Sequence, residues 1–200
     1  MNLFESETSL NILPKDGEVF YIENALTYND AAKLFDTLLH QIQWKHDEVV
    51  LFGKHIITKR KTSWYGDKEY IYKYSGITRK ANIWTKELLD LKNILEQITG
   101  DTYNSCLLNL YHDGGEGMSW HADNEDTLVP LSSIASLSLG ATRKFGFKHI
   151  HTKETIYIPL EPGSILNMKG QTQNYWLHCL PKSTKVNKPR INLTFRKMID

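Results

Sequence analysis

Apolar residues recur at helical spacing in two segments of the first half of the chain. Over residues 29–42 they occupy positions 31, 34, 35, 38, 39 and 42, which predicts a helix with one buried face. The side-chain oxygen of Thr27 or Asn29 can cap its N-terminus. Over residues 84–99 the apolar positions are 88, 91, 95 and 98, and Gly100 is expected to end this second helix. Both stripes indicate helices packed against a core.

Most of the remaining chain carries short runs that are typical of β-strands. The sequence Glu161-Pro162-Gly163-Ser164 predicts a turn between two of them. Early helices followed by many short strands indicate an α+β fold, in which two helices support one side of a double-sheet β-roll. The mouth of such a roll can hold a metal and a small ligand. The expected strands are 19–22, 49–58, 70–74, 105–112, 133–139, 143–150, 154–160, 164–168 and 190–198.

Length and composition narrow the class of protein. The chain has 200 residues without repeats or linkers, so we expect a single domain, 1–200. A net charge of +1 excludes a broadly basic tail as the basis of function, and two cysteines exclude a disulfide-stapled scaffold. There is no basic leader, and no apolar run approaches the roughly 20 residues that span a bilayer. We therefore expect a monomer without membrane association, in the cytoplasm, or in the nucleus of a eukaryotic source.

One short motif suggests a metal site. In Trp120-His121-Ala122-Asp123 an imidazole and a carboxylate are two positions apart, so an extended segment would point both to the same side. His178, farther along the chain, is the candidate third ligand. Two histidines and one carboxylate leave coordination positions open, which suits Fe(II). Zn²⁺ accepts the same ligand types, and a lone H-x-D tripeptide also occurs in solvated loops, so the motif alone leaves the metal open.

The last expected strand alternates strictly between polar and apolar side chains. Its apolar residues are Ile191, Leu193 and Phe195, and its polar residues are Arg190, Asn192, Thr194 and Arg196. A polar face in water would explain this alternation too. Two arginines around Asn and Thr instead favour a lining for a dicarboxylate, because guanidinium groups bind carboxylates through paired hydrogen bonds. A dicarboxylate that also chelates iron has the shape of 2-oxoglutarate. Asn109 and Tyr111 share another strand face and could bind the same anion.

Taken together, these residues resemble the AlkB family of nucleic-acid dealkylating oxygenases over roughly residues 50–198. The matching motifs are Asn109-Leu-Tyr111-His-Asp113-Gly114, Met118-Ser-Trp120-His121-Ala-Asp123-Asn-Glu125, Ser138-Leu-Gly140-Ala-Thr-Arg143 and Arg190-x-Asn192-x-Thr194-x-Arg196. The resemblance implies a double-stranded β-helix, or jelly roll, with Fe(II) on His121, Asp123 and His178. It implies that Arg190 pairs with the distal carboxylate of 2-oxoglutarate and that the other arginine lies near the metal. The expected cosubstrate ligands are Asn109, Tyr111, Arg190, Asn192, Thr194 and Arg196.

A narrower resemblance concerns residues 49–80, which look like the nucleotide-recognition lid of members that repair duplex DNA. It divides the chain into an N-terminal arm and helix (1–48), a lid of hairpins (49–80), and a helix plus catalytic β-roll (81–200). It implies that Phe52 fills the gap left by an extruded base and that Tyr74 stacks on this base opposite His121. A core position for Phe52 and cross-strand packing for the tyrosines are the alternatives. The further candidates for nucleic-acid contact are Gly53, Lys54, Arg60, Tyr72, Glu125 and Arg143.

The implied reaction is oxidative dealkylation in DNA repair. An N-alkyl group on a base such as methyladenine or methylcytosine would be hydroxylated with 2-oxoglutarate and O₂, and formaldehyde, succinate and CO₂ would be released. Fold and iron site do not determine the substrate, so the same chemistry on RNA or protein is an alternative. A non-catalytic β-roll binding module and a zinc hydrolase are two others. The intact ligand trio and the two arginines argue against the binding module, and in a zinc hydrolase the strand that carries the arginines would lack a purpose. The polar residues of 170–176 receive no role.

Overall fold

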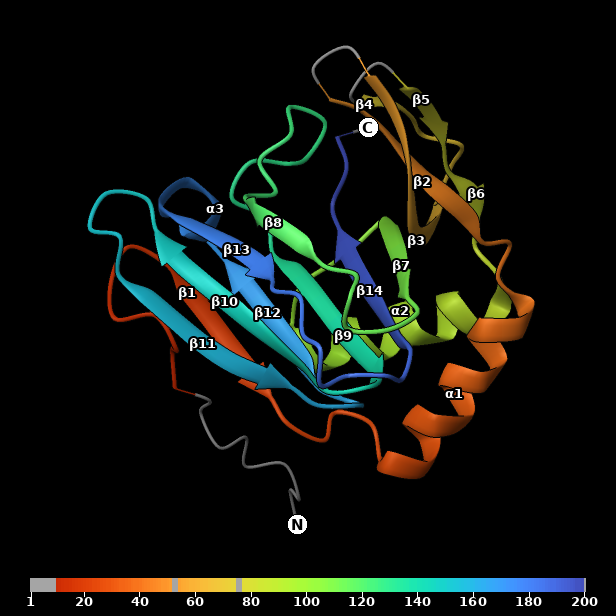
Figure 1. The fold of residues 1–200 in the computed structure, drawn as a ribbon, viewed down its shortest axis with the longest axis horizontal. Coiled ribbons are helices and arrows are strands. Elements are labelled where there is room, and N and C mark those ends of the chain that lie inside the picture. Colours follow the sequence, from red (N-terminus) through yellow and green to blue (C-terminus); the bar gives the residue numbers. More distant parts are fainter. Residues whose placement is uncertain (1–9, 52–53, 75–76, 200) are drawn as a thin grey trace.

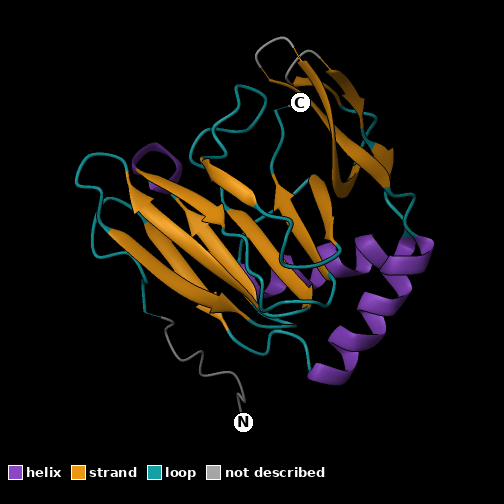
Figure 2. Ribbon diagram, in the orientation of Figure 1, coloured by secondary structure: helices purple, strands orange, loops and turns teal. Residues whose placement is uncertain are grey.

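Two β-sheets face each other, and two helices cover the outer face of the larger sheet (Figures 1 and 2). In this computed structural model the described residues are 10–51, 54–74 and 77–199, without the side chains of 49, 51, 72–74, 77 and 78. One apolar cluster joins the helices to the larger sheet, and a second fills the space between the sheets. The two helices and the two facing sheets therefore bury their apolar faces against one another.

The larger sheet has eight strands. Its order is β1 (Glu18–Ile22), β12 (Ile165–Lys169), β9 (Ile134–Gly140), β14 (Arg190–Arg196), β7 (Ser105–Tyr111), β3 (Lys54–Gly66) and β2 (Lys45–Leu51), and β6 (Asn82–Ile83) pairs with β3. The smaller sheet has the order β11 (Thr155–Leu160), β10 (Arg143–His149), β13 (Trp176–Leu180) and β8 (Met118–His121). Strands β7 to β14 thus supply four neighbouring strands to each sheet. This winding is a double-stranded β-helix, and it confirms the predicted fold class.

Both predicted helices are present. The first, α1 (Tyr28–Gln41), is capped by the Thr27 side chain, which accepts a hydrogen bond from the Asp30 backbone N–H. The second, α2 (Lys86–Thr99), begins two residues later than expected, because Thr85 is its N-cap. Gly100 ends it in the left-handed conformation, at φ 72°, as its position after the apolar stripe predicted.

The region before α2 differs from the expectation. The predicted strand over 49–58 is wrong as a single element: the chain reverses direction within it, and β2 and β3 pair antiparallel. Apolar β-branched residues on both sides of the reversal made two strands look like one. Strands β4 (Ile71–Tyr74) and β5 (Ile77–Lys80) form a separate two-stranded sheet next to β2 and β3 (Figure 1).

Three elements around the expected site were not predicted. They are β8, β13 and the short helix α3 (Thr172–Tyr175), which precedes β13. In the register of the smaller sheet, His178 of β13 lies directly opposite His121 of β8. This pairing brings residues from distant parts of the sequence together at one end of the roll. None of the described helices is long and apolar enough to cross a lipid bilayer.

Candidate metal and cosubstrate site

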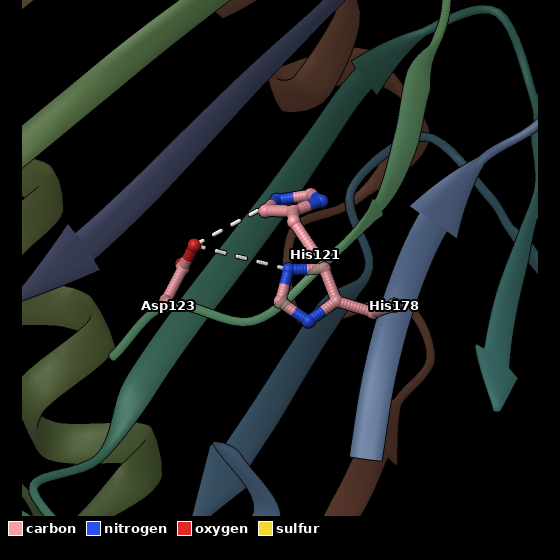
Figure 3. Close-up of side chains that lie close together, drawn as sticks. All are labelled: His121, Asp123 and His178. Carbon is pink, nitrogen blue, oxygen red and sulfur yellow. Dashed lines mark ion pairs between the residues drawn. The ribbon is translucent and has the colours of Figure 1, made fainter. Parts of the chain in front are cut away.

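The three predicted metal ligands lie together at the edge of the smaller sheet (Figure 3). Asp123 Oδ1 lies 3.7 Å from His121 Nε2 and 3.9 Å from His178 Nε2. The two imidazole rings meet edge to face, with 4.2 Å between their centroids. One ligand atom from each residue therefore faces a common point, as one metal ion requires.

The protonation states of the trio suit a metal. The His121 Nδ1–H donates to the Ser119 carbonyl oxygen at 2.8 Å, which leaves the Nε2 lone pair directed at the common point. Burial lowers the pKa of His178 to about 3, so this imidazole is neutral. Burial alone would raise the pKa of Asp123, but the positive charge of Arg196 and its hydrogen bond to the carboxylate outweigh burial and lower this pKa to about 2. The carboxylate is therefore ionised at neutral pH.

Two further residues orient Asp123. Arg196 Nη2 donates to Asp123 Oδ2 at 2.6 Å, which leaves Oδ1 for the metal. The Asp123 backbone N–H donates to Gln173 Oε1 of α3 at 2.9 Å. A third residue, Phe145 of β10, acts on the ligand His178: the two rings stack with 5.6 Å between their centroids, which limits rotation of the imidazole. Outer contacts of this kind orient metal ligands and tune their affinity.

The polar face of β14 continues from this point along one wall of a cleft. The predicted alternation is confirmed: Ile191, Leu193 and Phe195 are in the core, whereas Arg190, Asn192, Thr194 and Arg196 line the cleft. Arg196 lies at the metal end, and Arg190 lies at the other end of the strand. Because the lining side chains are largely buried, the polar face is not a solvated strand surface.

Arg190 is held at a fixed place in the wall. Its Nη2 donates to Ser138 Oγ at 2.8 Å and to Asn192 Oδ1 at 2.7 Å. Burial lowers its pKa to about 10, so it is still a cation at neutral pH. Among the described residues, the buried Nε atoms of Arg190 and Arg196 have no hydrogen-bond acceptor. A dicarboxylate in the cleft would supply one to each, so these residues fit 2-oxoglutarate.

Strand β7, which pairs with β14 in the larger sheet, supplies the adjacent part of this polar lining. Asn109 and Tyr111 are buried, line the cleft and lie in register with Asn192 and Arg190. The Tyr111 ring also has a position that the sequence did not indicate. Three guanidinium carbons lie 5.8–5.9 Å from its centroid, those of Arg60, Arg143 and Arg190. At the cosubstrate end of the cleft, Tyr111 therefore lies among arginines from three strands, β3, β10 and β14.

The cleft has a volume of about 820 Å³ and extends from the metal ligands to the hairpins of residues 45–80. Of the predicted nucleic-acid contacts, Arg60 and Glu125 line it, and Glu125 Oε2 is buried without a hydrogen-bond donor among the described residues. Lys54 is exposed at the start of β3. Phe52 and Gly53 lie outside the described residues, as do the side chains of Tyr72 and Tyr74 of β4.

Arg143 does not have the predicted place. Its side chain is 1% exposed, and its two Nη atoms donate to the carbonyl oxygens of Asp113, Glu116 and Pro181 at 2.7–3.2 Å. A phosphate cannot reach this guanidinium without breaking those bonds. The expected phosphate contact is therefore corrected: Arg143 ties together the loops after β7 and β13.

Sequence reasoning missed two residues of the site. Gln173 belongs to a segment without any motif, and only its contact with the Asp123 backbone reveals its role. Asp47 lines the cleft as a buried carboxylate between two arginines, although it sits in a polar run that reads as surface. The sequence offers no cue for Asp47, which stands between His46 and Glu48 outside the expected strands.

Comparison with known proteins agrees with the geometry. The family model of the 2OG-Fe(II) oxygenase superfamily matches residues 18–196. The human protein named DNA oxidative demethylase ALKBH2 is 35% identical over 181 residues, covering 85% of this chain and 69% of that protein. The bovine alpha-ketoglutarate-dependent dioxygenase alkB homolog 3 is 39% identical over 177 residues, covering 84% of this chain and 61% of that protein.

A solved structure of OsALKBH1 has the same fold, with a TM-score of 0.57 at 14% identity over 90% of this chain and 96% of that chain. The match of the superfamily model spans β1 to β14 and includes all three metal ligands. Each relative is similar over most of the present chain. The chain belongs to the 2OG-Fe(II) oxygenase superfamily and, within it, to the AlkB family.

Proposed function

We propose that this protein repairs DNA by oxidative removal of N-alkyl groups from damaged bases, with Fe(II), 2-oxoglutarate and O₂. The observation that carries the proposal is the single cleft that contains the metal ligands, the two arginines of β14 and the hairpins of residues 45–80. Its volume of about 820 Å³ is sufficient for a small cosubstrate and an extruded base together. The human relative of similar sequence is named a DNA oxidative demethylase.

In this proposal His121, Asp123 and His178 hold Fe(II), which together with 2-oxoglutarate and O₂ supplies the oxidant for hydroxylation of the alkyl carbon. Arg190 binds the distal carboxylate, and Arg196 keeps Asp123 ionised and oriented. The cleft walls hold the target carbon near the metal ligands and exclude water. One oxygen atom of O₂ enters succinate as 2-oxoglutarate loses CO₂, and the other enters the alkyl group, which then leaves the base as formaldehyde.

The proposed substrate is an alkylated base in duplex DNA, extruded from its stack into the cleft. Phe52 fills the vacated place, Tyr74 stacks on the base, and Glu125 lies beside it at the cleft rim. Support comes from the resemblance of residues 49–80 to the lid of duplex-repairing members and from the cleft position of Glu125. Tyr72, Gly53, Lys54 and Arg60 remain predicted contacts. Action on RNA or on a protein is the alternative that the substrate test has to separate.

A formaldehyde-release assay tests the function. Duplex DNA, single-stranded DNA and RNA of one sequence, each with one methyladenine or methylcytosine, are incubated with Fe(II) and 2-oxoglutarate. We expect formaldehyde and succinate in equal amounts once the succinate formed without nucleic acid is subtracted, with the highest kcat/KM for duplex DNA. His121→Ala and Asp123→Ala are the controls that should abolish turnover. Release from RNA alone, or iron-dependent turnover by these two variants, would overturn the substrate or the ligand assignment respectively.

The role of Phe52 has a test of its own. Phe52→Ala should lower kcat/KM on the duplex by about tenfold and leave the single strand nearly unaffected, because only the duplex has a gap to fill (base–aromatic stacking is worth ~1–3 kcal/mol). Equal losses on both substrates would remove the proposed role. Leu51→Ala, at the neighbouring position, is the control.

A further inference from the structure

The pairing of β2 with β3 is irregular at one place, and Asp47 lies there. His46 pairs with Lys61 and Glu48 pairs with Ile57, so residues 58–60 of β3 face Asp47 alone. The Thr58 hydroxyl donates to the Arg60 carbonyl oxygen at 3.0 Å, and His46 Nδ1 lies 2.9 Å from the Thr58 carbonyl oxygen. Irregularities of this kind redirect side chains. Here Asp47 and Arg60 both face the cleft.

Asp47 joins two separate β-sheets through its two carboxylate oxygens. Oδ2 accepts a hydrogen bond from Arg60 Nη2 of β3, and Oδ1 accepts one from Arg79 Nη2 of β5. Arg79 Nη2 also donates to the Glu48 carbonyl oxygen at 3.1 Å. The carboxylate is 2% exposed, so water screens these charges little. The β4–β5 hairpin is thereby fastened to the strands that form the cleft wall.

The guanidinium group of Arg60 also reaches the cosubstrate end of the cleft through its second terminal nitrogen. Its Nη1 donates to Met118 Sδ of β8 at 3.1 Å, and its guanidinium carbon lies 5.9 Å from the Tyr111 ring centroid. Burial lowers the pKa of Arg60, but the charges of Tyr111 and Asp47 outweigh this effect and raise it. One guanidinium therefore contacts a hairpin strand, the strand that leads to His121, and the predicted cosubstrate ligand Tyr111.

We propose that Asp47 is a positioning residue that holds the β4–β5 hairpin and Arg60 in place for the nucleic-acid substrate. The proposal rests on the function proposed above and adds a residue that does not itself touch metal or cosubstrate. Asp47 contacts the two arginines and no metal ligand, so its loss should disturb substrate engagement rather than metal or 2-oxoglutarate binding. Two partly buried guanidinium groups without their shared carboxylate repel each other, and the hairpin that carries Arg79 is the part that can move away.

Asp47→Asn is the informative change, because it removes the charge and keeps the shape. Its matched control is Glu48→Gln, the neighbouring carboxylate, which pairs with His55 at 2.8 Å on the exposed side of the hairpin. We expect Asp47→Asn to raise KM for a methylated oligonucleotide by at least about tenfold. Succinate formation without nucleic acid should fall by a clearly smaller factor, since Asp47 itself contacts neither a metal ligand nor a predicted cosubstrate ligand. Asp47→Glu keeps the charge, so its KM should lie between that of the wild type and that of Asp47→Asn.

Hydrogen exchange gives a readout that does not need activity. In Asp47→Asn, backbone amides of residues 71–80 should exchange at least about tenfold faster, while those of β7 and β14 stay unchanged. Arg79→Gln, which removes one arm of the contact at a less buried position, should give the same pattern and carries the test if Asp47→Asn fails to fold. Unchanged exchange in 71–80, or equal loss of succinate formation with and without nucleic acid, would overturn the proposal. If the wild-type protein dealkylates no substrate, the proposed function fails, and the exchange comparison still decides whether Asp47 holds the hairpin.

Discussion

Arg196 donates from Nη2 to Asp123 Oδ2 at 2.6 Å, across the open end of the β-roll. This contact links the last strand of the fold to the loop that follows β8. It also fixes which carboxylate oxygen is available, because Oδ1 is the atom that faces both imidazoles. One arginine thereby serves the metal site rather than the distal end of the cosubstrate.

Replacing Arg196 should therefore weaken metal binding. Arg196→Met removes the charge that keeps Asp123 ionised and the bond that orients it, and we expect the Kd for Fe(II) to rise about 10–100-fold. An anaerobic titration with Fe(II) in the presence of 2-oxoglutarate measures this. Lys197→Met, at the next position, is the control with the same change of charge. An unchanged Kd would show that Arg196 has no part in the metal site.

Arg190 should behave differently, because it lies at the other end of β14. Arg190→Lys keeps the positive charge but loses the planar fork that binds a carboxylate through two bonds, so KM for 2-oxoglutarate should rise about tenfold or more. The Kd for Fe(II) alone should not change. Steady-state kinetics with varied 2-oxoglutarate and a metal titration separate the two quantities. A loss of Fe(II) affinity equal to the rise in KM would contradict the assignment.

The fold could be predicted because its sequence signals are local. The stripes of α1 and α2, their caps and the alternation of β14 each follow from spacing within about two turns or one strand. The division between β2 and β3 was missed in the strand assignment, since apolar β-branched residues stand on both sides of the reversal, at 49–50 and 56–57. Strands β8 and β13 were missed because their pattern is short and their pairing joins residues 121 and 178.

The site shows the same division between local and distant signals. His121 and Asp123 form a motif, and the arginines of β14 share a strand face, so sequence reasoning could find them. Gln173 and Asp47 act through contacts with residues at least 13 positions away, and no spacing rule reveals such contacts. Arg143 shows the converse: its motif position was read correctly, but its burial against three carbonyl groups makes its role structural.

The corrected role of Arg143 has a measurable consequence. Arg143→Met removes its hydrogen bonds to three backbone carbonyl groups, of which, among the described residues, only that of Asp113 keeps another donor, the Glu116 N–H. We expect the free energy of unfolding to fall by about 2–4 kcal/mol. Urea denaturation measures this loss. The salt dependence of DNA binding should keep its wild-type slope, because no phosphate contact is removed. A slope reduced by about one, with unchanged stability, would restore the phosphate contact instead.

Gln173 should affect metal binding without affecting the fold. Its Oε1 accepts a hydrogen bond from the Asp123 backbone N–H at 2.9 Å, which holds the backbone of Asp123 in place after β8. Gln173→Ala should raise the Kd for Fe(II) about tenfold, because Asp123 gains freedom that metal binding must remove. Asn174→Ala, an exposed neighbour in α3, is the matched control and should leave Kd unchanged. The melting temperature of both variants without metal should stay within about 2 °C of the wild type, which corresponds to roughly 0.5 kcal/mol. Equal Kd values for the two variants would show that Asp123 keeps its orientation without this bond.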